Sequence, residues 1–262
     1  METEKIGQFG GSVILPCITT TKKANPMAMV EEAKNRGLKE VGLFATAFDV
    51  SQRKELYKAL EEAGLKIPFV HLRHDFNGEE VEYLIRNFGA KVLNLHAAKE
   101  RKFIFLNELH KYSDKIFIEN SATLPERLEP KRWAGLCFDI AHCEDWKRRL
   151  ATNFDEVADL MSKSHWKKWR KTACRGLSKW NWLLSRYPVG VVHISAVQNA
   201  THPDEGGLPE DRYDCHVFKE LSDFDYLKNY AEYSNCPYLV MELTNPIREQ
   251  LRAIEYIKSF WV

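Results

Sequence analysis

The sequence predicts an α/β protein, a (β/α)8 TIM barrel with a long helical insertion, residues 143–189, between its sixth and seventh strands. The prediction rests on three observations. Short runs rich in Val, Ile and Phe alternate with amphipathic segments. These runs are apolar throughout, as is typical of strands covered on both faces. The length of 262 residues suits one barrel of about 250 residues. We therefore expect residues 1–262 to form a single domain.

The expected strands and helices follow one another regularly. One helix has Asn25 as its N-cap and Pro26 in its first turn, and the next has Ser51 as its N-cap and ends at Gly64. No G-x-G-x-x-G motif follows the first strand, which disfavours an open dinucleotide-binding sheet. The expected strands are 12–18, 40–46, 66–73, 91–98, 115–122, 135–142, 190–197 and 236–243, and the expected helices outside the insertion are 25–37, 51–64, 78–89, 103–113, 125–135, 218–234 and 245–260.

The insertion has an unusual composition. Residues 162–182 hold seven lysines or arginines, no acidic residue and four of the seven tryptophans. Extra segments of this length are commonly lids or binding loops. Two interpretations remain open: the tryptophans stack on exposed bases while basic side chains bind phosphate, or the segment is an amphipathic helix with buried tryptophans and a solvated basic face. The basic residues proposed for phosphate are Lys167, Lys168, Arg170 and Lys171.

Composition excludes several classes of protein. With 44% hydrophobic and 29% charged residues the chain is globular, and its net charge of +1 argues neither for nor against a nucleic-acid partner. The amino terminus lacks a secretory signal, and no apolar run reaches the ~18 residues of a membrane span. The six cysteines include no C-x-x-C pair. We expect a soluble, cytoplasmic protein with reduced thiols; its oligomeric state is not predicted.

Six consecutive expected strands end in a histidine or an acidic residue. Because parallel barrel strands converge at their carboxyl ends, where barrel active sites form, we expect these side chains to share one site. Three carboxylates in a partly dehydrated cavity need a cation to remain ionised, and oxygen with imidazole suits Zn²⁺, Mn²⁺ or Fe²⁺ better than Ca²⁺. The pattern therefore predicts a divalent metal centre. The six residues are His71, His96, Glu119, Asp139, His193 and Glu242.

Several motifs resemble a known family. FIENSA, CFDIAH, VVHIS, DCH and LVMEL are similar to the metal-binding strand ends of AP endonuclease family 2, the superfamily of endonuclease IV and the xylose-isomerase-like sugar isomerases and epimerases. The resemblance covers the third to the eighth strand and implies a metal-dependent TIM-barrel enzyme. The chain departs from the endonuclease pattern after its first and fourth strands, where the glycine-histidine and histidine-proline-glycine motifs are absent, and after His193, where the acidic residue of the pattern is missing.

The resemblance implies ligands for one to three ions, with Zn²⁺ preferred and Mn²⁺ or Fe²⁺ as alternatives. In the endonuclease branch His71 and His96 would bind the first ion, and Glu119 would bridge it to the second. The second ion would also be bound by Asp139, His193 and Glu242, and the third by His142, Asp214 and His216.

Two residues offer an alternative to part of this set. His202 and Asp204, in THPDEGG, compete with Asp214 and His216 for the third ion. Asp214 and His216 are preferred because they lie just before the seventh helix, where the family has these ligands. His74 similarly competes with His71, which is preferred because it directly continues the apolar run.

Two enzyme functions follow from the resemblance. The preferred one is phosphodiester hydrolysis of the endonuclease IV type, a DNA-repair reaction at abasic sites, in which Glu119 orients or deprotonates water. The alternative is a single-metal sugar or keto-acid isomerase or epimerase acting on a small sugar or phosphorylated substrate, in which Glu119 and Glu242 move a proton. Hydrolysis is preferred because a single-metal isomerase would give His71, His96 and the third ligand set no metal to bind. A barrel that binds metal or nucleic acid without catalysis ranks last.

Overall fold

The computed structural model describes residues 8–9, 12–21, 23–96, 104–120, 130–203 and 211–261. Within these residues ten strands form one sheet in the order β1-β2-β12-β9-β8-β7-β6-β5-β4-β3, and every neighbouring pair except β1 and β2 is parallel. These strands are β1 Gln8–Phe9, β2 Ser12–Leu15, β3 Cys17–Thr19, β4 Glu40–Phe44, β5 Lys66–Leu72, β6 Val92–His96, β7 Ile116–Glu119, β8 Gly135–Asp139, β9 Val189–Ile194 and β12 Tyr238–Met241.

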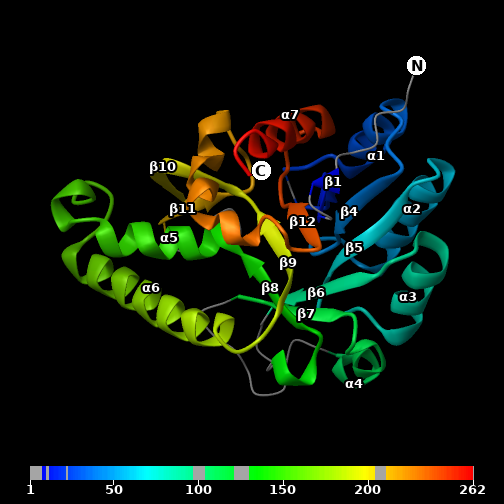
Figure 1. Ribbon diagram of the computed structural model, residues 1–262, viewed down its shortest axis with the longest axis horizontal. Helices are drawn as coiled ribbons and strands as arrows, with labels where there is room; N and C mark the ends of the chain where they lie inside the picture. Colours follow the sequence, from blue (N-terminus) through cyan, green and yellow to red (C-terminus); the bar gives the residue numbers. More distant parts are fainter. Residues whose placement is uncertain are drawn as a thin grey trace.

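Helices surround this sheet, and a separate antiparallel hairpin leaves it after β9 (Figure 1). The hairpin consists of β10 Ala196–Pro203 and β11 Asp211–Cys215. The α-helices are α1 Pro26–Asn35, α2 Val50–Glu62, α3 Gly78–Tyr83, α4 Leu106–Leu109, α5 Ile140–Ala151, α6 Lys163–Leu184 and α7 Ile247–Lys258. A π-helical turn covers Leu84–Phe88, and 3-10 segments cover His110–Tyr112, Pro130–Arg132, Phe154–Glu156 and Leu221–Tyr233.

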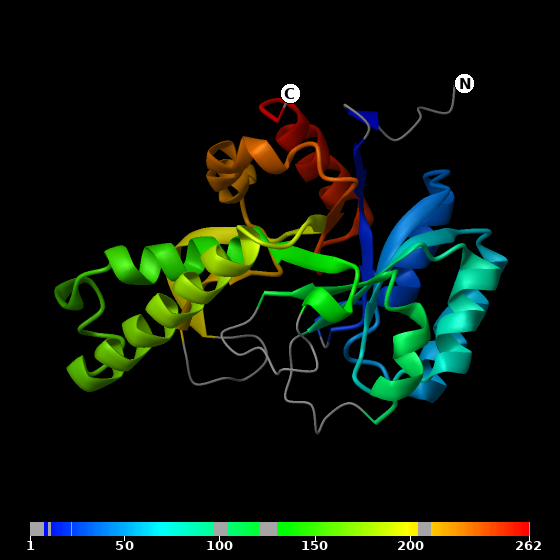
Figure 2. The same ribbon diagram turned by 60° about the horizontal axis from the view of Figure 1, so that its bottom comes forward.

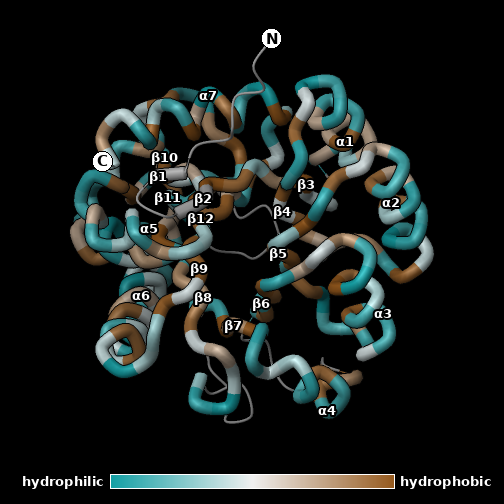
Figure 3. Tube along the Cα trace, turned by 45° about the vertical axis from the view of Figure 1, so that its right-hand side comes forward, coloured by the Kyte–Doolittle hydropathy of each residue, from teal (hydrophilic) through white to brown (hydrophobic). Residues whose placement is uncertain are grey.

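The first strand of the barrel, formed by β2 and β3 together, closes the ring. β2 pairs with β12, β3 pairs with β4, and only Pro16 separates β2 from β3 in the chain. The two short strands are therefore halves of one interrupted stave, and the staves form a ring with the helices outside it (Figure 3). Proline has no N–H to donate to a neighbouring strand, but the Pro16 carbonyl still accepts a hydrogen bond from Gly42 N at 2.9 Å. The predicted (β/α)8 barrel is confirmed.

Gln250 of α7 holds the chain where the first strand is interrupted. Its side chain is fully buried, and its Oε1 accepts a hydrogen bond from Cys17 N at 2.7 Å. Its Nε2 donates to the carbonyl oxygens of Cys17 and Asn245, both at 2.9 Å. Because buried backbone groups without partners are costly, this one amide stabilises the closure of the barrel.

Side chains fill the barrel interior below the carboxyl ends of the strands. The rings of Phe44 and Phe69 lie 5.5 Å apart, in one cluster with Cys17 and Val240. A Cβ atom on Gly42 would lie 2.2 Å from Cys17 Sγ, so β4 requires glycine at this close approach. The interior is thus a packed core that supports the mouth from below.

The insertion forms α5 and α6, which pack against each other and project from the side of the barrel (Figures 1 and 2). Trp169 and Trp180 of α6 are buried, and the indole of Trp166 donates to the Thr152 carbonyl at 3.3 Å. Trp182 is 49% exposed. The interpretation of α6 as an amphipathic helix with buried tryptophans is therefore confirmed for Trp169 and Trp180, which are not available to stack on bases.

Several boundaries differ from those expected. α1 begins after Asn25 as predicted, with Pro26 in its first turn, but the N-cap of α2 is Asp49 and not Ser51. Asp49 accepts from Gln52 N at 3.0 Å, and the Gln52 side chain accepts from Asp49 N, so a full capping box two residues upstream extends the helix. The helix expected over 125–135 falls partly outside the described residues.

The six cysteines form no disulfide. Among the described helices, none has the length and apolar character that a membrane span needs.

Replacing Gln250 by Leu should destabilise the barrel by about 2–4 kcal/mol, because Cys17 N and two carbonyl oxygens lose their buried partner. Thermal unfolding monitored by circular dichroism should show a midpoint lower by roughly 5–10 °C. Arg252→Leu, at an exposed position on the same helix, is the control and should shift the midpoint little. An unchanged midpoint in Gln250→Leu would show that the closure does not depend on this amide.

Candidate metal centre

The six strand-end residues converge at the carboxyl end of the barrel, as the sequence predicts. Strand register brings neighbours side by side: His96 of β6 lies opposite Glu119 of β7, and Asp139 of β8 lies opposite His193 of β9. Glu242 follows the last residue of β12 and reaches the same point. Glu119, Asp139 and His193 are almost completely buried, so these charges lie in the protein and not in bulk water.

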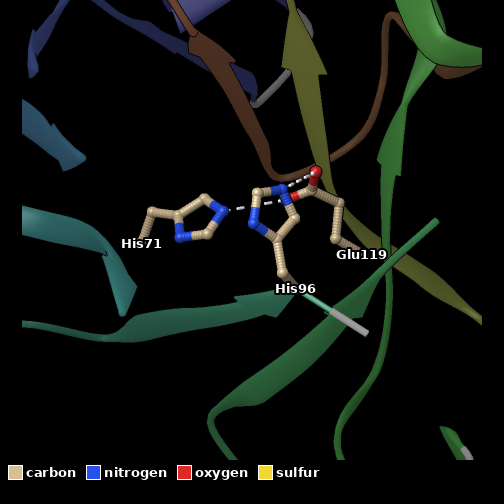
Figure 4. A group of neighbouring side chains, drawn as sticks. All are labelled: His71, His96 and Glu119. Carbon is tan, nitrogen blue, oxygen red and sulfur yellow. Dashed lines mark hydrogen bonds and ion pairs between the residues drawn. The ribbon is translucent and has the colours of Figure 1, made fainter. Parts of the chain in front are cut away.

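Glu119 is the centre of the cluster. Its Oε2 lies 3.0 Å from His71 Nε2, while its Oε1 lies 2.8 Å from His96 Nε2 (Figure 4). On the other side, His193 Nδ1 lies 3.3 Å from Glu119 Oε2 and 3.2 Å from Glu242 Oε2. One carboxylate is therefore shared by two groups of potential ligands.

Ligand atoms in each of these groups lie within 4.8 Å of one another, which is close enough to hold a metal ion. The groups, among the described residues, are His71 with His96 and Glu119, and Glu119 with Asp139, His193 and Glu242. They match the first and second ligand sets expected from the sequence. Their binding of metal stays a prediction.

The second group contains buried polar atoms that make no well-directed hydrogen bond with the described residues, although most of them lie within ion-pair distance of another charged group, as Glu119 Oε1 does of His96 Nε2 at 2.8 Å. They are Glu119 Oε1, Asp139 Oδ2, Glu242 Oε2 and both ring nitrogens of His193. Buried polar atoms are normally satisfied, so this concentration of unsatisfied atoms in one place requires an explanation. A divalent cation fits the group, because every one of these atoms is a metal-ligand type and three of the four residues carry negative charge.

The pKa values show how the charges balance. Burial alone would raise the pKa of Glu119, but His96 and His193 hold it well below its ordinary value. Burial would lower the pKa of His193, but Glu119 and Glu242 raise it above the ordinary value. For His71, burial and the nearby His96 both lower the pKa. The buried carboxylates thus favour a proton on His193, and a metal bound there would compete with that proton.

The floor of the mouth is aromatic. Ring centroids of Phe44 and Phe69 lie 5.1 and 5.4 Å from that of His193, so the apolar barrel interior begins directly below the ligand groups. This surface raises the cost of an uncompensated charge at the site.

The third expected set, His142 with Asp214 and His216, is not brought together as one group among the described residues. His142 Nδ1 lies 2.9 Å from Asp139 Oδ2 and its Nε2 lies 3.6 Å from Asp214 Oδ2, but His216 Nε2 lies 3.5 Å from Glu242 Oε1. Arg212 binds both oxygens of Asp214, through Nε at 2.6 Å and through a second guanidinium nitrogen. A guanidinium therefore already compensates the charge of Asp214.

The pKa of His142 follows from this arrangement. Burial opposes protonation, but the carboxylates of Asp139 and Asp214 raise the pKa of His142 to about 9. The alternative ligand His202 lies in β10, while Asp204 is outside the described residues. The third ligand set stays a prediction in both versions.

Two members of the site, Asn94 and Cys137, were not expected from the sequence. Asn94 Nδ2 donates to Glu119 Oε2 at 2.6 Å, which fixes the orientation of the carboxylate. The sequence could have indicated Asn94, because it lies two residues before His96 in VLNLH and therefore on the same face of the strand. Cys137 also joins Glu119 and His193 in a possible ligand group, but burial, followed by the charge of Glu119, raises its pKa well above the ordinary value and disfavours the thiolate.

The proposed phosphate-binding residues lie on α6, away from the ligand groups. Lys167, Lys168 and Lys171 are exposed. Arg170 has a structural contact instead, because it donates to the Thr152 carbonyl at 2.9 Å and lies 4.9 Å above the Trp166 ring. The four residues thus differ in their availability to a ligand.

No protein-family model matches the chain. No curated protein matches it. A xylose isomerase-like TIM barrel protein from Mycobacterium smegmatis, solved in complex with magnesium, is similar in structure with 12% identity, 90% of this chain and 88% of that chain covered and a TM-score of 0.42. An uncharacterised B. cereus protein matches with 10% identity, 92% and 64% coverage and a TM-score of 0.39. The IOLI protein with a binding zinc atom matches with 12% identity, 94% and 73% coverage and a TM-score of 0.24. These likenesses are too distant to assign a family or an activity.

Adding Zn²⁺ or Mn²⁺ to chelator-treated protein should raise its unfolding temperature, because an ion bound only by the folded state stabilises it by about 2.7 kcal/mol at a hundred times its dissociation constant. Asp139→Asn should abolish most of this gain while preserving the N-cap of α5, since Asn keeps the oxygen that accepts from His142 N. Asp114→Asn, at an exposed carboxylate, is the matched control. Equal metal-induced shifts in all three proteins would exclude Asp139 as a ligand.

We expect a third ion to bind more weakly than two others, because Asp214 has to share its carboxylate with Arg212. Titration against a chromophoric chelator should give two tight equivalents per chain in the wild type. Arg212→Gln should tighten the third equivalent by at least about tenfold, the effect of ~1.4 kcal/mol. A third equivalent that is already as tight as the first two in the wild type would contradict this expectation.

Proposed function

We propose that the chain is a metal-dependent hydrolase of phosphodiesters, of the endonuclease IV type, and that it uses Zn²⁺, with Mn²⁺ or Fe²⁺ as alternatives. The observation that supports the proposal is the sharing of the Glu119 carboxylate between two ligand groups. A bridging carboxylate between two ligand groups is suited to paired ions, and paired ions are typical of nucleases and phosphatases. A DNA duplex with an abasic site is the substrate that the sequence resemblance implies.

Bound divalent ions would supply Lewis acidity, lowering the pKa of water and compensating charge on the phosphate. The protein's own groups have separate tasks. Asn94 and His71 hold one oxygen of Glu119 in a fixed orientation at 2.6 and 3.0 Å, so this carboxylate acts as a rigid base and ligand. Glu242 is 12% exposed, which leaves its carboxylate partly accessible to accept a proton at the edge of the site.

A single-metal isomerase or epimerase is the second candidate. It is favoured by one observation: Glu119, Asp139, His193 and Glu242 alone form a complete four-residue group, and their unsatisfied atoms need no further ligand. In that reaction Glu119 and Glu242 would move a proton between carbon atoms of a small sugar. The number of tightly bound ions distinguishes the two, since one ion favours isomerisation and two or more favour hydrolysis.

Glu119→Gln should reduce metal-dependent cleavage of a duplex with a synthetic abasic site by at least about 10²-fold, since the variant loses both the shared ligand and the base. Gel analysis of the labelled strand measures cleavage, and circular dichroism verifies that the variant is folded. Glu55→Gln, at an exposed position of α2, should cleave like the wild type.

The proposal fails if wild-type protein loaded with Zn²⁺, Mn²⁺ or Fe²⁺ leaves phosphodiesters intact. It also fails if Glu119→Gln retains full turnover. Interconversion of sugars by the loaded protein, lost in the same variant, would establish the second candidate instead.

A further inference from the structure

α6 carries a row of basic residues with a regular spacing. The basic row consists of Lys163, Lys167, Lys171, Arg175 and Lys179, each four residues from the next, and Lys168 lies beside it. Residues at this spacing lie on one face of a helix, with a rise of about 6 Å from one to the next. α6 contains no acidic residue. The row is thus a line of positive charge along the helix.

The central cations of this row have no protein counter-charge. Lys167, Lys168, Lys171 and Arg175 are exposed, and none of them forms an ion pair or a side-chain hydrogen bond with the described residues. Exposed cations on other helices do form such pairs with acidic residues three or four positions away. Examples are Arg36–Glu32, Arg86–Glu82 and Lys228–Asp225.

Like charges four residues apart destabilise a helix, so packing has to hold α6 in place. Its other face supplies that packing: Trp169, Ala173 and Trp180 are buried, and Gly176 lies so close to α5 that a Cβ atom would be 2.9 Å from the Trp146 ring. α5 and α6 together project from the barrel (Figure 2). Packing of the opposite face therefore fixes the orientation of the basic row.

We propose that the basic row of α6 binds the phosphate backbone of duplex DNA and is a docking surface separate from the metal centre. The inference rests on the proposed function, which requires a phosphodiester substrate. Evenly spaced cations suit a regular polyanion, and contacts to phosphate position a nucleic acid without reading its sequence. Trp169 and Trp180 do not stack on bases at this surface, because they are buried.

An anionic membrane is a poorer partner for this helix. Interfacial helices bury an apolar face in the lipid, but the apolar face of α6 is already packed in the protein. A small sugar phosphate is also a poor fit, because one phosphate would engage only a small part of a row that covers four turns of helix. The charge pattern favours an extended anion.

The test is the salt dependence of DNA binding by the full chain. Fluorescence anisotropy with an intact labelled duplex, in EDTA so that no metal chemistry occurs, gives affinity as a function of salt concentration. The quadruple variant K167Q/K168Q/K171Q/R175Q should bind at least about tenfold more weakly at low salt, and the slope of log affinity against log salt should fall in magnitude by about 3. The matched control K39Q/K54Q/K66Q/K91Q removes the same charge from exposed sites elsewhere and should retain the wild-type slope.

Folding is checked independently. The quadruple variant should unfold at the same or a higher temperature than the wild type, because it relieves like-charge repulsion along α6. If the quadruple variant and the matched control have equal slopes and affinities, the proposal is overturned. Wild-type binding to phosphatidylserine vesicles but not to DNA would overturn it too.

Failure of the proposed function gives a different result. In that case the row still binds DNA in a salt-dependent manner, but the metal-loaded protein does not cleave it. If instead the quadruple variant binds intact DNA as tightly as the control while the loaded protein cleaves phosphodiesters, only the role of α6 is lost.

Discussion

The site depends on one electrostatic constraint: three carboxylates lie together where water is scarce. Glu119 and Asp139 are buried, and Glu242 is nearly so, above a floor of phenylalanine rings. Each charge lowers the tendency of the others to ionise, so the group stays ionised only with cations beside it. Imidazoles beside the group lower the pKa of Glu119, while five donor or acceptor atoms of the second ligand group make no well-directed hydrogen bond among the described residues.

Barrel geometry creates this crowding. Parallel strands in register bring His96 beside Glu119 and Asp139 beside His193, and the pairing of β12 with β9 places Glu242 next to them. Closure of the ring at Pro16 brings β4 and β5, with His71, round to β12. Gln250 stabilises that closure from α7, on the outside of the barrel. This buried amide, which is not a member of the charged cluster, thus contributes to the convergence of charges, because an open sheet would not bring its two ends together.

Much of this arrangement could be predicted from the sequence, and the limits have physical reasons. A polar residue that ends an apolar run is recognisable one strand at a time, so His71, Glu119 and His193 were found together with their neighbours. The pairing of Arg212 with Asp214 was not, because no strand was expected over residues 211–215, where the two side chains lie on one face of β11. The spacing of the tryptophans in the sequence also did not show which of them are buried; in the structure Trp169 and Trp180 are buried, whereas Trp182 is exposed.

The mouth and α6 use charge in opposite ways. At the mouth, burial makes each interaction strong and nearly independent of salt, and few geometries satisfy it, which is what a catalytic site requires. Along α6, Lys167, Lys168, Lys171 and Arg175 are exposed, and dissolved salt screens their charges. Each contact of such a cation with an anion is therefore weak, reversible and sensitive to ionic strength. A protein that has to hold a long anion and react at a single phosphate needs both regimes. The projecting position of α6 keeps its exposed cations apart from the buried cluster.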